Sequence, residues 1–211
     1  MKGQAPFVGK TVSMKRKITW IRHGQSTWNA EGKWQGHTDV PLSELGREQA
    51  TALGRRLESK RFDAVYSSDL TRARQTCELA LPQQTMLLDE RLREINFGVY
   101  EGKSRDTLTA AEADAVKTWW IEPYLERLQG GESMTCLNTR VGDFLAELPA
   151  ECEVAIFTHG GVIRNALWQV VGVPVQGAWS VQIENTSVTV LEYTTERTLV
   201  HRVNDSAHLE G

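Results

Sequence analysis

Two short apolar segments of this chain end in a histidine followed by glycine, and this repeated pattern constrains the fold more than any other feature. The segments are Ile18-Thr19-Trp20-Ile21, followed by Arg22-His23-Gly24, and Val154-Ala155-Ile156-Phe157, followed by Thr158-His159-Gly160-Gly161. Short apolar runs bounded in this way are typical of strands in an α/β sheet. Because ligands of such sheets bind where strands end, we expect His23 and His159 to meet at one ligand.

Length and composition favour one globular domain without a general attraction to polyanions. The chain has 211 residues, of which 40% are hydrophobic and 24% charged, enough to bury one sizeable core. Its net charge of -3 gives no long-range attraction to nucleic acid or to an anionic membrane surface. Any anion must therefore be bound by locally placed arginines. We expect a flexible N-terminal extension over residues 1–16 and a single domain over residues 17–211.

The cysteines and histidines give no sign of a disulfide framework or a metal site. Cys77, Cys136 and Cys152 are an odd number and form no Cys-x-x-Cys pair. The histidines show no His-x-x-x-His spacing, which argues against a metal hydrolase. No segment resembles the apolar core of a signal peptide or a membrane span. We therefore expect a cytoplasmic protein that binds neither a metal nor a membrane.

Periodicity and turn residues predict further strands and helices. Ser43 is the expected N-cap of a helix through Ser59, whose sheet-facing residues are Leu45, Ala50, Leu53 and Leu57. Other expected helices begin at Ser67–Asp69 or span Ala110–Trp120, Ser133–Leu148 and Val162–Val171. Expected strands are Phe62–Tyr66, Met86–Leu88, Val181–Ile183, and a hairpin of Ser187–Tyr193 with Thr198–Val203. The chain is thus predicted to be an α/β protein.

Two charged residues outside the histidine segments are candidates for a site. Arg72 lies near the start of an expected helix, where free backbone N–H groups and the helix dipole favour an anion. Helical spacing points Arg72 and Arg74 in different directions, so we expect only one of them at the ligand. Glu94 is the candidate carboxylate, in a loop punctuated by glycines at Gly98 and Gly102.

Six motifs with these residues follow one another in a set order. They are Arg22-His23-Gly24 with Ser26 and Asn29; Gln35-Gly36 with Asp39, Pro41, Leu42 and Gly46; Ser67-Ser68-Asp69-Leu70-Thr71-Arg72-Ala73 with Thr76; Leu92-Arg93-Glu94 with Gly98 and Glu101-Gly102; Gly130-Gly131-Glu132-Ser133; and Thr158-His159-Gly160-Gly161. In type and order they resemble the histidine phosphatase superfamily, in its phosphoglycerate mutase-like branch. The resemblance covers Ile18 to Glu192 and implies a three-layer α/β/α sandwich with a mostly parallel central sheet.

The resemblance also implies a role for each motif residue. His23 would carry a transient phosphoryl group, and positive charge from Arg22, Arg72 and His159 would both hold the phosphate and favour a neutral imidazole. Glu94 would protonate the leaving alkoxide and then activate water. Glu101, the competing carboxylate, resembles a structural turn residue of the family. The other implied phosphate-binding residues are Ser26, Asn29, Gln35, Gly36 and Gly160.

The acid loop favours a phosphatase over a mutase. Glu94 is followed by Ile95-Asn96-Phe97-Gly98, which is similar to the broad-specificity and α-ribazole phosphatases, whereas the mutases carry Arg-His-Tyr-Gly. We therefore expect a metal-independent phosphomonoesterase that acts on a small phosphorylated metabolite, with no cofactor and no nucleic-acid partner. A cofactor-dependent phosphoglycerate mutase and a non-catalytic phosphate-binding module on the same fold are the alternatives.

Specificity and assembly stay open at this point. We expect the segments Glu31–Asp39 and Lys103–Gly130 to set specificity, and their tryptophans indicate only that part of the leaving group is apolar. An amphipathic helix face or a hairpin edge can serve a homodimer or a core equally well. The sequence therefore indicates a reaction class but does not identify the substrate.

Overall fold

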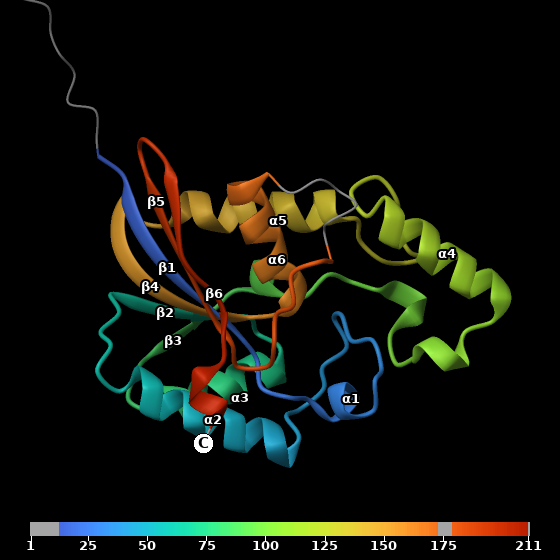
Figure 1. Cartoon of the computed structure of the whole chain (residues 1–211), viewed down its shortest axis with the longest axis horizontal. Coiled ribbons are helices and arrows are strands. Elements are labelled where there is room, and N and C mark those ends of the chain that lie inside the picture. The colour runs from blue at the N-terminus through green and yellow to red at the C-terminus, as the bar shows by residue number, and fades with distance from the viewer. Residues whose placement is uncertain (1–12, 173–178, 211) are drawn as a thin grey trace, which may run out of the picture.

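The computed structural model describes residues 13–172 and 179–210, which contain a six-stranded sheet and flanking helices (Figure 1). The strands are β1 (Lys15–Arg22), β2 (Ala64–Ser67), β3 (Met86–Leu88), β4 (Glu151–Thr158), β5 (Val188–Thr194) and β6 (Thr198–Asp205). The α-helices are α1 (Thr27–Ala30), α2 (Glu44–Leu57), α3 (Thr71–Ala80), α4 (Ala110–Ile121), α5 (Met134–Glu147) and α6 (Gly160–Val171). Short 3-10 helices occupy Glu90–Leu92, Gly98–Tyr100, Arg105–Thr107 and Ala207–Leu209.

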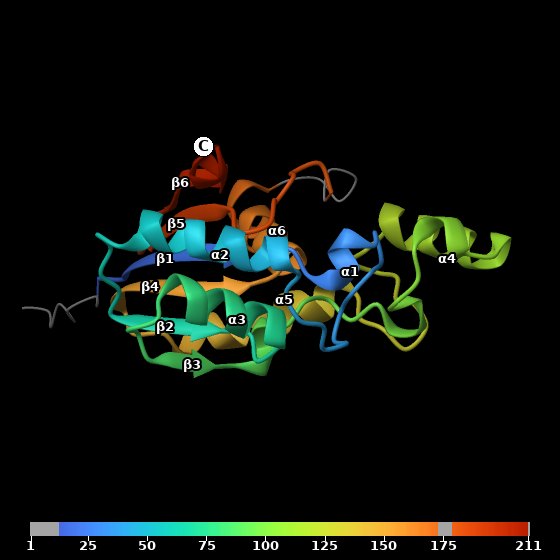
Figure 2. The same cartoon turned by 90° about the horizontal axis from the view of Figure 1, so that it is seen from below.

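The sheet is mostly parallel, with an antiparallel hairpin at one side. Its order is β3-β2-β4-β1-β5-β6, in which the first four strands run parallel and β5 and β6 pair antiparallel. Figure 2 shows α2 and α3 on one face of the sheet and α5 and α6 on the other. The predicted three-layer α/β/α architecture is therefore confirmed.

The two central strands bury both faces, which explains their continuous apolar sequences. Alternate side chains point to opposite faces of a strand. Ile18 and Trp20 of β1 belong to the core beneath α5 and α6, whereas Ile21 belongs to the core beneath α2 and α3. β4 alternates in the same way, with Ile156 on the first side and Phe157 on the second. These strands fix the position of whatever follows them.

Helix α2 begins as predicted but buries a different face. The Ser43 side chain accepts a hydrogen bond from the Gly46 backbone N–H, 3.1 Å away. The buried stripe is Gly46, Ala50, Leu53 and Leu57. Leu45 is 48% exposed, so its predicted packing on the sheet is wrong. It precedes Gly46 by one residue, which turns its side chain about 100° away from the buried stripe.

Two other boundaries differ from the sequence prediction. β1 begins at Lys15, three residues before Ile18, and Lys15 and Arg16 pair with β4 although they were expected in the N-terminal extension. Residues 1–12 of that extension lie outside the described residues. The expected strand Val181–Ile183 does not form. Its carbonyl groups bind arginine side chains instead of a neighbouring strand.

The remaining expected elements form close to their predicted limits. Helix α5 buries Met134, Leu137, Val141 and Phe144, as its periodicity indicates. Gly172, with a positive φ of 63°, ends α6. Figure 1 shows α4 beyond the edge of the sheet, so this helix extends the molecule on the side of α1. None of the helices in the described part of the chain has the length and apolar character needed to cross a membrane.

Candidate active site

The two histidines meet because their strands are neighbours. β1 and β4 pair in parallel with Arg22 opposite Thr158, so His23 and His159 leave the sheet at the same level. The His23 N–H donates to the Thr158 carbonyl, 2.9 Å away. The two imidazole rings lie 5.1 Å apart between centroids and meet at 60°. Both side chains are buried.

The hydrogen bonding of His23 decides which ring nitrogen can react. Nδ1 lies 2.7 Å from the Gly24 carbonyl oxygen, which can only accept. Nδ1 therefore carries the proton, and Nε2 keeps a free lone pair in the neutral ring. Burial, followed by the charges of Arg72 and Arg22, holds the pKa of His23 well below its ordinary value. The ring is thus neutral and nucleophilic at Nε2.

His159 is held beside it by a second hydrogen bond. Its Nε2 lies 2.9 Å from the Ser68 hydroxyl oxygen. Burial lowers the pKa of His159 well below the ordinary value, and the charge of Arg72 adds to this effect. Nδ1 is buried and meets no hydrogen-bond partner among the described residues.

Two buried arginines bring positive charge to this pair. Arg22 donates from Nη1 to the carbonyl of Ile183, in the segment that was expected to be a strand, at 2.6 Å. Arg72 donates to the carbonyls of Gly36 at 2.7 Å and Thr38 at 3.0 Å. Burial lowers the pKa of each arginine to about 10, so both remain charged at neutral pH.

These partners are neutral, so the charges of the two arginines are not neutralised by them. The buried Nε–H groups of Arg22 and Arg72 also meet no acceptor in residues 13–172 and 179–210. Unpartnered buried donors on charged groups are costly unless a ligand satisfies them. The arrangement therefore fits a bound anion with several oxygen atoms.

The expected difference between Arg72 and Arg74 is observed. Arg72 is completely buried near the start of α3, whereas the Arg74 side chain is 43% exposed and faces Glu78 on the same helix. The helix start differs in detail, because Leu70 occupies the N-cap position without a side-chain hydrogen bond. Asp69, expected near that cap, pairs with Arg93 instead.

Glu94 reaches the site from the loop that precedes Gly98. Its carboxylate accepts from the Gly161 N–H at 3.0 Å and from the Ile95 N–H at 2.9 Å. A Cβ atom on Gly161 would lie 2.2 Å from Glu94 Oε1, so only glycine permits this approach. Glu101 is engaged elsewhere, since its carboxylate accepts from the backbone N–H groups of His37 and Thr38. Its structural role agrees with the motif.

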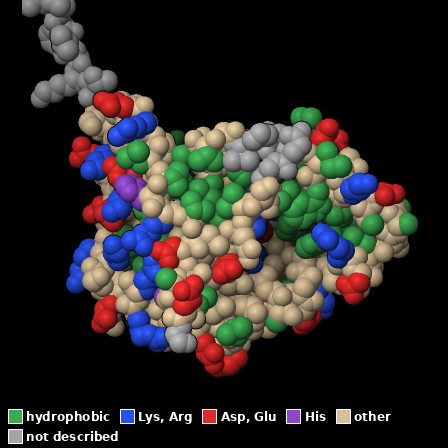
Figure 3. Space-filling view, viewed as in Figure 1, with side chains coloured by type: hydrophobic (Ala, Val, Ile, Leu, Met, Phe, Trp, Pro, Cys, Tyr) green, Lys and Arg blue, Asp and Glu red, His purple; other side chains and the backbone are tan. Residues whose placement is uncertain are grey.

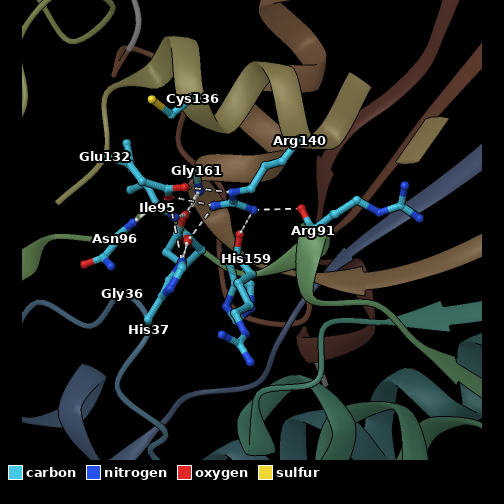
Figure 4. Close-up of polar contacts among 12 residues, drawn as sticks. Gly36, His37, Arg91, Ile95, Asn96, Glu132, Cys136, Arg140, His159 and Gly161 are labelled. Atoms are coloured by element: carbon cyan, nitrogen blue, oxygen red, sulfur yellow. Dashed lines mark hydrogen bonds and ion pairs between the residues drawn. The ribbon is translucent and has the colours of Figure 1, made fainter. Parts of the chain in front are cut away.

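Arg140 holds the loop that carries Glu94, and sequence reasoning missed it. From α5 it donates to the carbonyls of Arg91 at 2.7 Å, Arg93 at 2.6 Å and Glu94 at 2.8 Å. The same guanidinium pairs with the Glu132 carboxylate at 2.9 and 3.0 Å (Figure 4). The one local feature that marks Arg140 in the sequence is its place directly before Val141, a buried residue of the apolar stripe of α5.

A cavity of about 280 Å³ joins these groups to an aromatic wall. It is lined by Arg22, His23, Asn29, Lys33, Trp34, Gln35, Glu94, Ile95, Phe97, Trp120, Gly161, Arg164 and Trp179. We call Arg22 and His23, together with the adjacent Arg72 and His159 that lie outside the lining, the histidine end. Trp34, Phe97, Trp120, Trp179 and Arg164 form the aromatic end. Figure 3 shows hydrophobic side chains beside a hollow in the surface. Glu94 lies where the two ends meet.

The other predicted phosphate-binding residues divide into two groups. Asn29 and Gln35 line the cavity. Ser26 is completely buried, is the N-cap of α1, and donates its hydroxyl to Gln35 Oε1 at 2.7 Å. Gly36 contributes the carbonyl that holds Arg72, and Gly160 begins α6. Ser26 therefore supports the lining residue Gln35, Gly36 supports Arg72, and neither of them lines the cavity itself.

Sequence comparison now identifies the class of protein. The family model of the histidine phosphatase superfamily (branch 1) matches residues 18–206, and the chain belongs to this family. The geometry described above is thus that of a histidine phosphatase fold carrying both motif histidines.

Individual relatives bear more than one functional name. The chain is 32% identical over 200 residues to "Putative phosphoserine phosphatase 2" of Hydrogenobacter thermophilus, covering 92% of this chain and 97% of the relative. It is also 32% identical over 204 residues to "Probable phosphoglycerate mutase GpmB" of Yersinia pestis, covering 92% and 95%. The crystal structure of the α-ribazole phosphatase from Shigella flexneri superposes with a TM-score of 0.80 at 26% identity, covering 90% and 96%. The relatives support a phosphatase and leave its substrate unassigned.

Proposed function

We propose that this protein is a phosphomonoesterase that works through a phosphohistidine at His23 and needs no metal ion. One observation carries the proposal. A neutral His23 with its free Nε2 lies beside Arg22 and Arg72, whose buried Nε–H groups have no acceptor among the described residues. A phosphate group placed there would satisfy both donors and face the nucleophile. The substrate class is a small phosphate ester.

The first step transfers the phosphoryl group to the protein. The His23 Nε2 lone pair forms a bond to phosphorus while the bond to the ester oxygen breaks. Arg22 and Arg72 stabilise the charge on the equatorial oxygens, since phosphoryl transfer depends mainly on positioning and electrostatics. His159 was expected to add positive charge, but its lowered pKa leaves the ring neutral, so it can contribute only a hydrogen bond. Protonated Glu94 gives its proton to the departing alkoxide, because a phosphate dianion next to a carboxyl favours the protonated acid.

The second step regenerates the histidine. Glu94, now a carboxylate, takes a proton from water, and the water oxygen bonds to phosphorus as the bond to His23 Nε2 breaks. Inorganic phosphate leaves, and Glu94 again holds its proton. The guanidinium groups supply the positive charge that a metal ion supplies in other phosphatases. Within the described residues no three His, Cys, Asp or Glu side chains are grouped to hold a metal ion.

The experiment is turnover in the presence of a chelator. The panel contains p-nitrophenyl phosphate, 3-phosphoglycerate, phosphoserine, α-ribazole phosphate and sugar phosphates, each with the wild type and with His23→Ala. We expect phosphate release that survives chelation and falls by roughly 10⁴-fold or more in the variant. Acid-labile, base-stable phosphate on the quenched wild type identifies the phosphohistidine. Loss of activity on chelation, or full activity without His23, would overturn the proposal.

A phosphoglycerate mutase is the second candidate, because one relative carries that name. It predicts interconversion of 2- and 3-phosphoglycerate after priming with a bisphosphate, with little phosphate release. Binding of phosphate esters without either reaction would indicate the non-catalytic module. We further propose a cytoplasmic location, since Cys77, Cys136 and Cys152 are all free thiols.

A further inference from the structure

Arg164 is a charged residue of the cavity that the reaction described above does not use. It lies on α6 one turn after Gly160, and its Nε–H donates to the Val181 carbonyl at 2.8 Å. Its guanidinium carbon lies 5.6 Å from the centre of the Trp179 ring. These two contacts fix the plane of the guanidinium and occupy only one of its five N–H donors. The terminal groups remain for a ligand.

Arg164 lies beside Arg22 and close to Glu94. Its Nη1 lies 3.1 Å from the point that a Cβ atom on Gly160 would occupy, and Arg22 Nε lies 3.7 Å from that same point. The next residue, Gly161, binds the Glu94 carboxylate. Arg164 therefore lies next to the phosphate-binding arginine and close to the acid that protonates the ester oxygen. A leaving group passes beside it.

The charges of the cavity do not balance with a phosphate alone. A phosphate dianion would be matched by Arg22 and Arg72, and Glu94 is uncharged while it serves as the acid. Lys33, the other cation of the lining, already pairs with Glu31 at 2.5 Å. No carboxylate lies within 4 Å of the Arg164 guanidinium in the described part of the chain. While Glu94 is protonated, one partly buried positive charge therefore has no ion-pair partner among the described residues.

We propose that Arg164 binds a carboxylate on the leaving group, so that the substrate is a small phosphorylated hydroxy acid. The proposal rests on the phosphatase function argued above. A carboxylate matches the planar fork of a guanidinium through two parallel hydrogen bonds. The cavity volume of about 280 Å³ suits a leaving group of few atoms. The aromatic walls Trp34, Phe97 and Trp120 exclude water around that ion pair and strengthen it.

The test compares two substrates that differ only in this group. 3-Phosphoglycerate carries a carboxylate where glycerol 3-phosphate carries a hydroxymethyl group. We expect wild-type kcat/KM for phosphate release to be about 10- to 100-fold higher with 3-phosphoglycerate, because a charge-assisted bidentate pair is lost with the other ester. Arg164→Gln should remove most of that preference. Lys33→Gln, which removes a cation that already has a partner, should keep it.

A binding measurement separates this proposal from the proposed function. Calorimetric titration of both esters into His23→Ala and into His23→Ala/Arg164→Gln reports the preference without turnover. A preference that depends on Arg164 supports the proposal even if the wild type isomerises 3-phosphoglycerate or releases no phosphate, outcomes that would defeat only the phosphatase assignment. Equal affinity for the two esters would overturn it. If the Arg164 variant lost affinity for both esters to the same degree, the proposal would also be overturned. Arg164 would then be assigned to binding of the transferred phosphoryl group.

Discussion

The two ends of the cavity are built in different ways. The histidine end comes from the last residue of β1, from the residues that directly follow β1 and β4, and from the first turn of α3, so the sheet itself sets the distance between the two imidazoles. The aromatic end comes from segments far apart in the sequence, including Trp34, Trp120 and Trp179, none of which lies in a strand. One end is fixed by the backbone of the sheet, and the other by contacts between loops and helix ends.

This difference separates the reaction from its specificity. Under the proposed function, the groups that act on every substrate lie at the ends of the central strands or beside them, and a small displacement there would cost the most in rate. The groups proposed to select the leaving group lie on segments outside the sheet, which can change without disturbing it. Glu94 lies where the two ends meet, and Arg140 holds its loop. Substitutions at these two residues therefore test whether changes at one end alter the function of the other.

The largest effect is expected at Glu94, which the proposed function makes the acid that protonates the leaving group. Glu94→Gln should lower kcat/KM for an alkyl phosphate by about 10²- to 10⁴-fold, because a general acid is lost. The loss with p-nitrophenyl phosphate should be much smaller, since nitrophenolate leaves without a proton. In the proposed mechanism, kcat/KM reports only the steps up to and including phosphorylation of the histidine. The later role of Glu94 in activating water therefore does not affect this comparison.

Glu101→Gln is the matched control for that experiment. Its carboxylate holds backbone N–H groups of His37 and Thr38, so its loss should affect the two substrates to the same degree and lower the thermal midpoint. If Glu94→Gln also affected both substrates equally, Glu94 would not be the acid. If Glu101→Gln showed the leaving-group dependence, the two carboxylates would have to exchange roles.

A smaller effect is expected at Arg140, which holds the loop of Glu94 and does not line the cavity. Arg140→Ala frees the carbonyls of Arg91, Arg93 and Glu94, and a displacement of the acid by about 1 Å can cost up to about 10²-fold in rate. We expect a loss of about 10- to 100-fold with the alkyl ester and less with the aryl ester. The measurement is the ratio of kcat/KM for the two esters.

Two further variants separate positioning from general stability. Arg140→Lys can keep the ion pair with Glu132 but cannot reach three carbonyls. Compared with Arg140→Ala, it should therefore recover more of the wild-type stability than of the wild-type ratio of kcat/KM for the two esters. Arg91→Gln removes the ion pairs with Asp89 and Glu147 on the far side of the same loop and should leave the ratio near its wild-type value. A ratio unchanged in Arg140→Ala would show that Arg140 is only structural.

The same contrast explains how much could be predicted from the sequence. The strand ends at His23 and His159, the choice of Arg72 over Arg74, and the α/β architecture follow from local patterns and short motifs. These features depend on residues that are near one another in the chain or on the pairing of two adjacent strands. Local information is sufficient there.

Prediction was weakest where a residue is defined by distant partners. Val181–Ile183 has the composition of a strand, but the side chains of Arg22 and Arg164 take up its carbonyls. Arg140 and Arg164 lie on helices with ordinary apolar stripes, and no local pattern marks the loop or the ring that each contacts. Leu45 shows a related limit, because several helix faces can fit one set of apolar residues.

The smallest expected effect concerns the histidine end alone, and it is a change in stability with pH. The pKa of His159 is lowered in the folded protein, chiefly by burial, whereas in the unfolded chain it is ordinary, at about 6.5. Below that value the unfolded state binds more protons, so the free energy of unfolding falls as pH falls. His159→Asn removes this group, so the decrease in the free energy of unfolding between about pH 7 and about pH 5.5 should be smaller by about 1 kcal/mol in the variant.

Urea unfolding at several pH values measures the difference, with a constant m-value showing that the unfolded state is unchanged. An identical pH dependence in the variant would mean that the pKa of His159 is the same in the folded and unfolded states, and the charge at the histidine end would then need a different account.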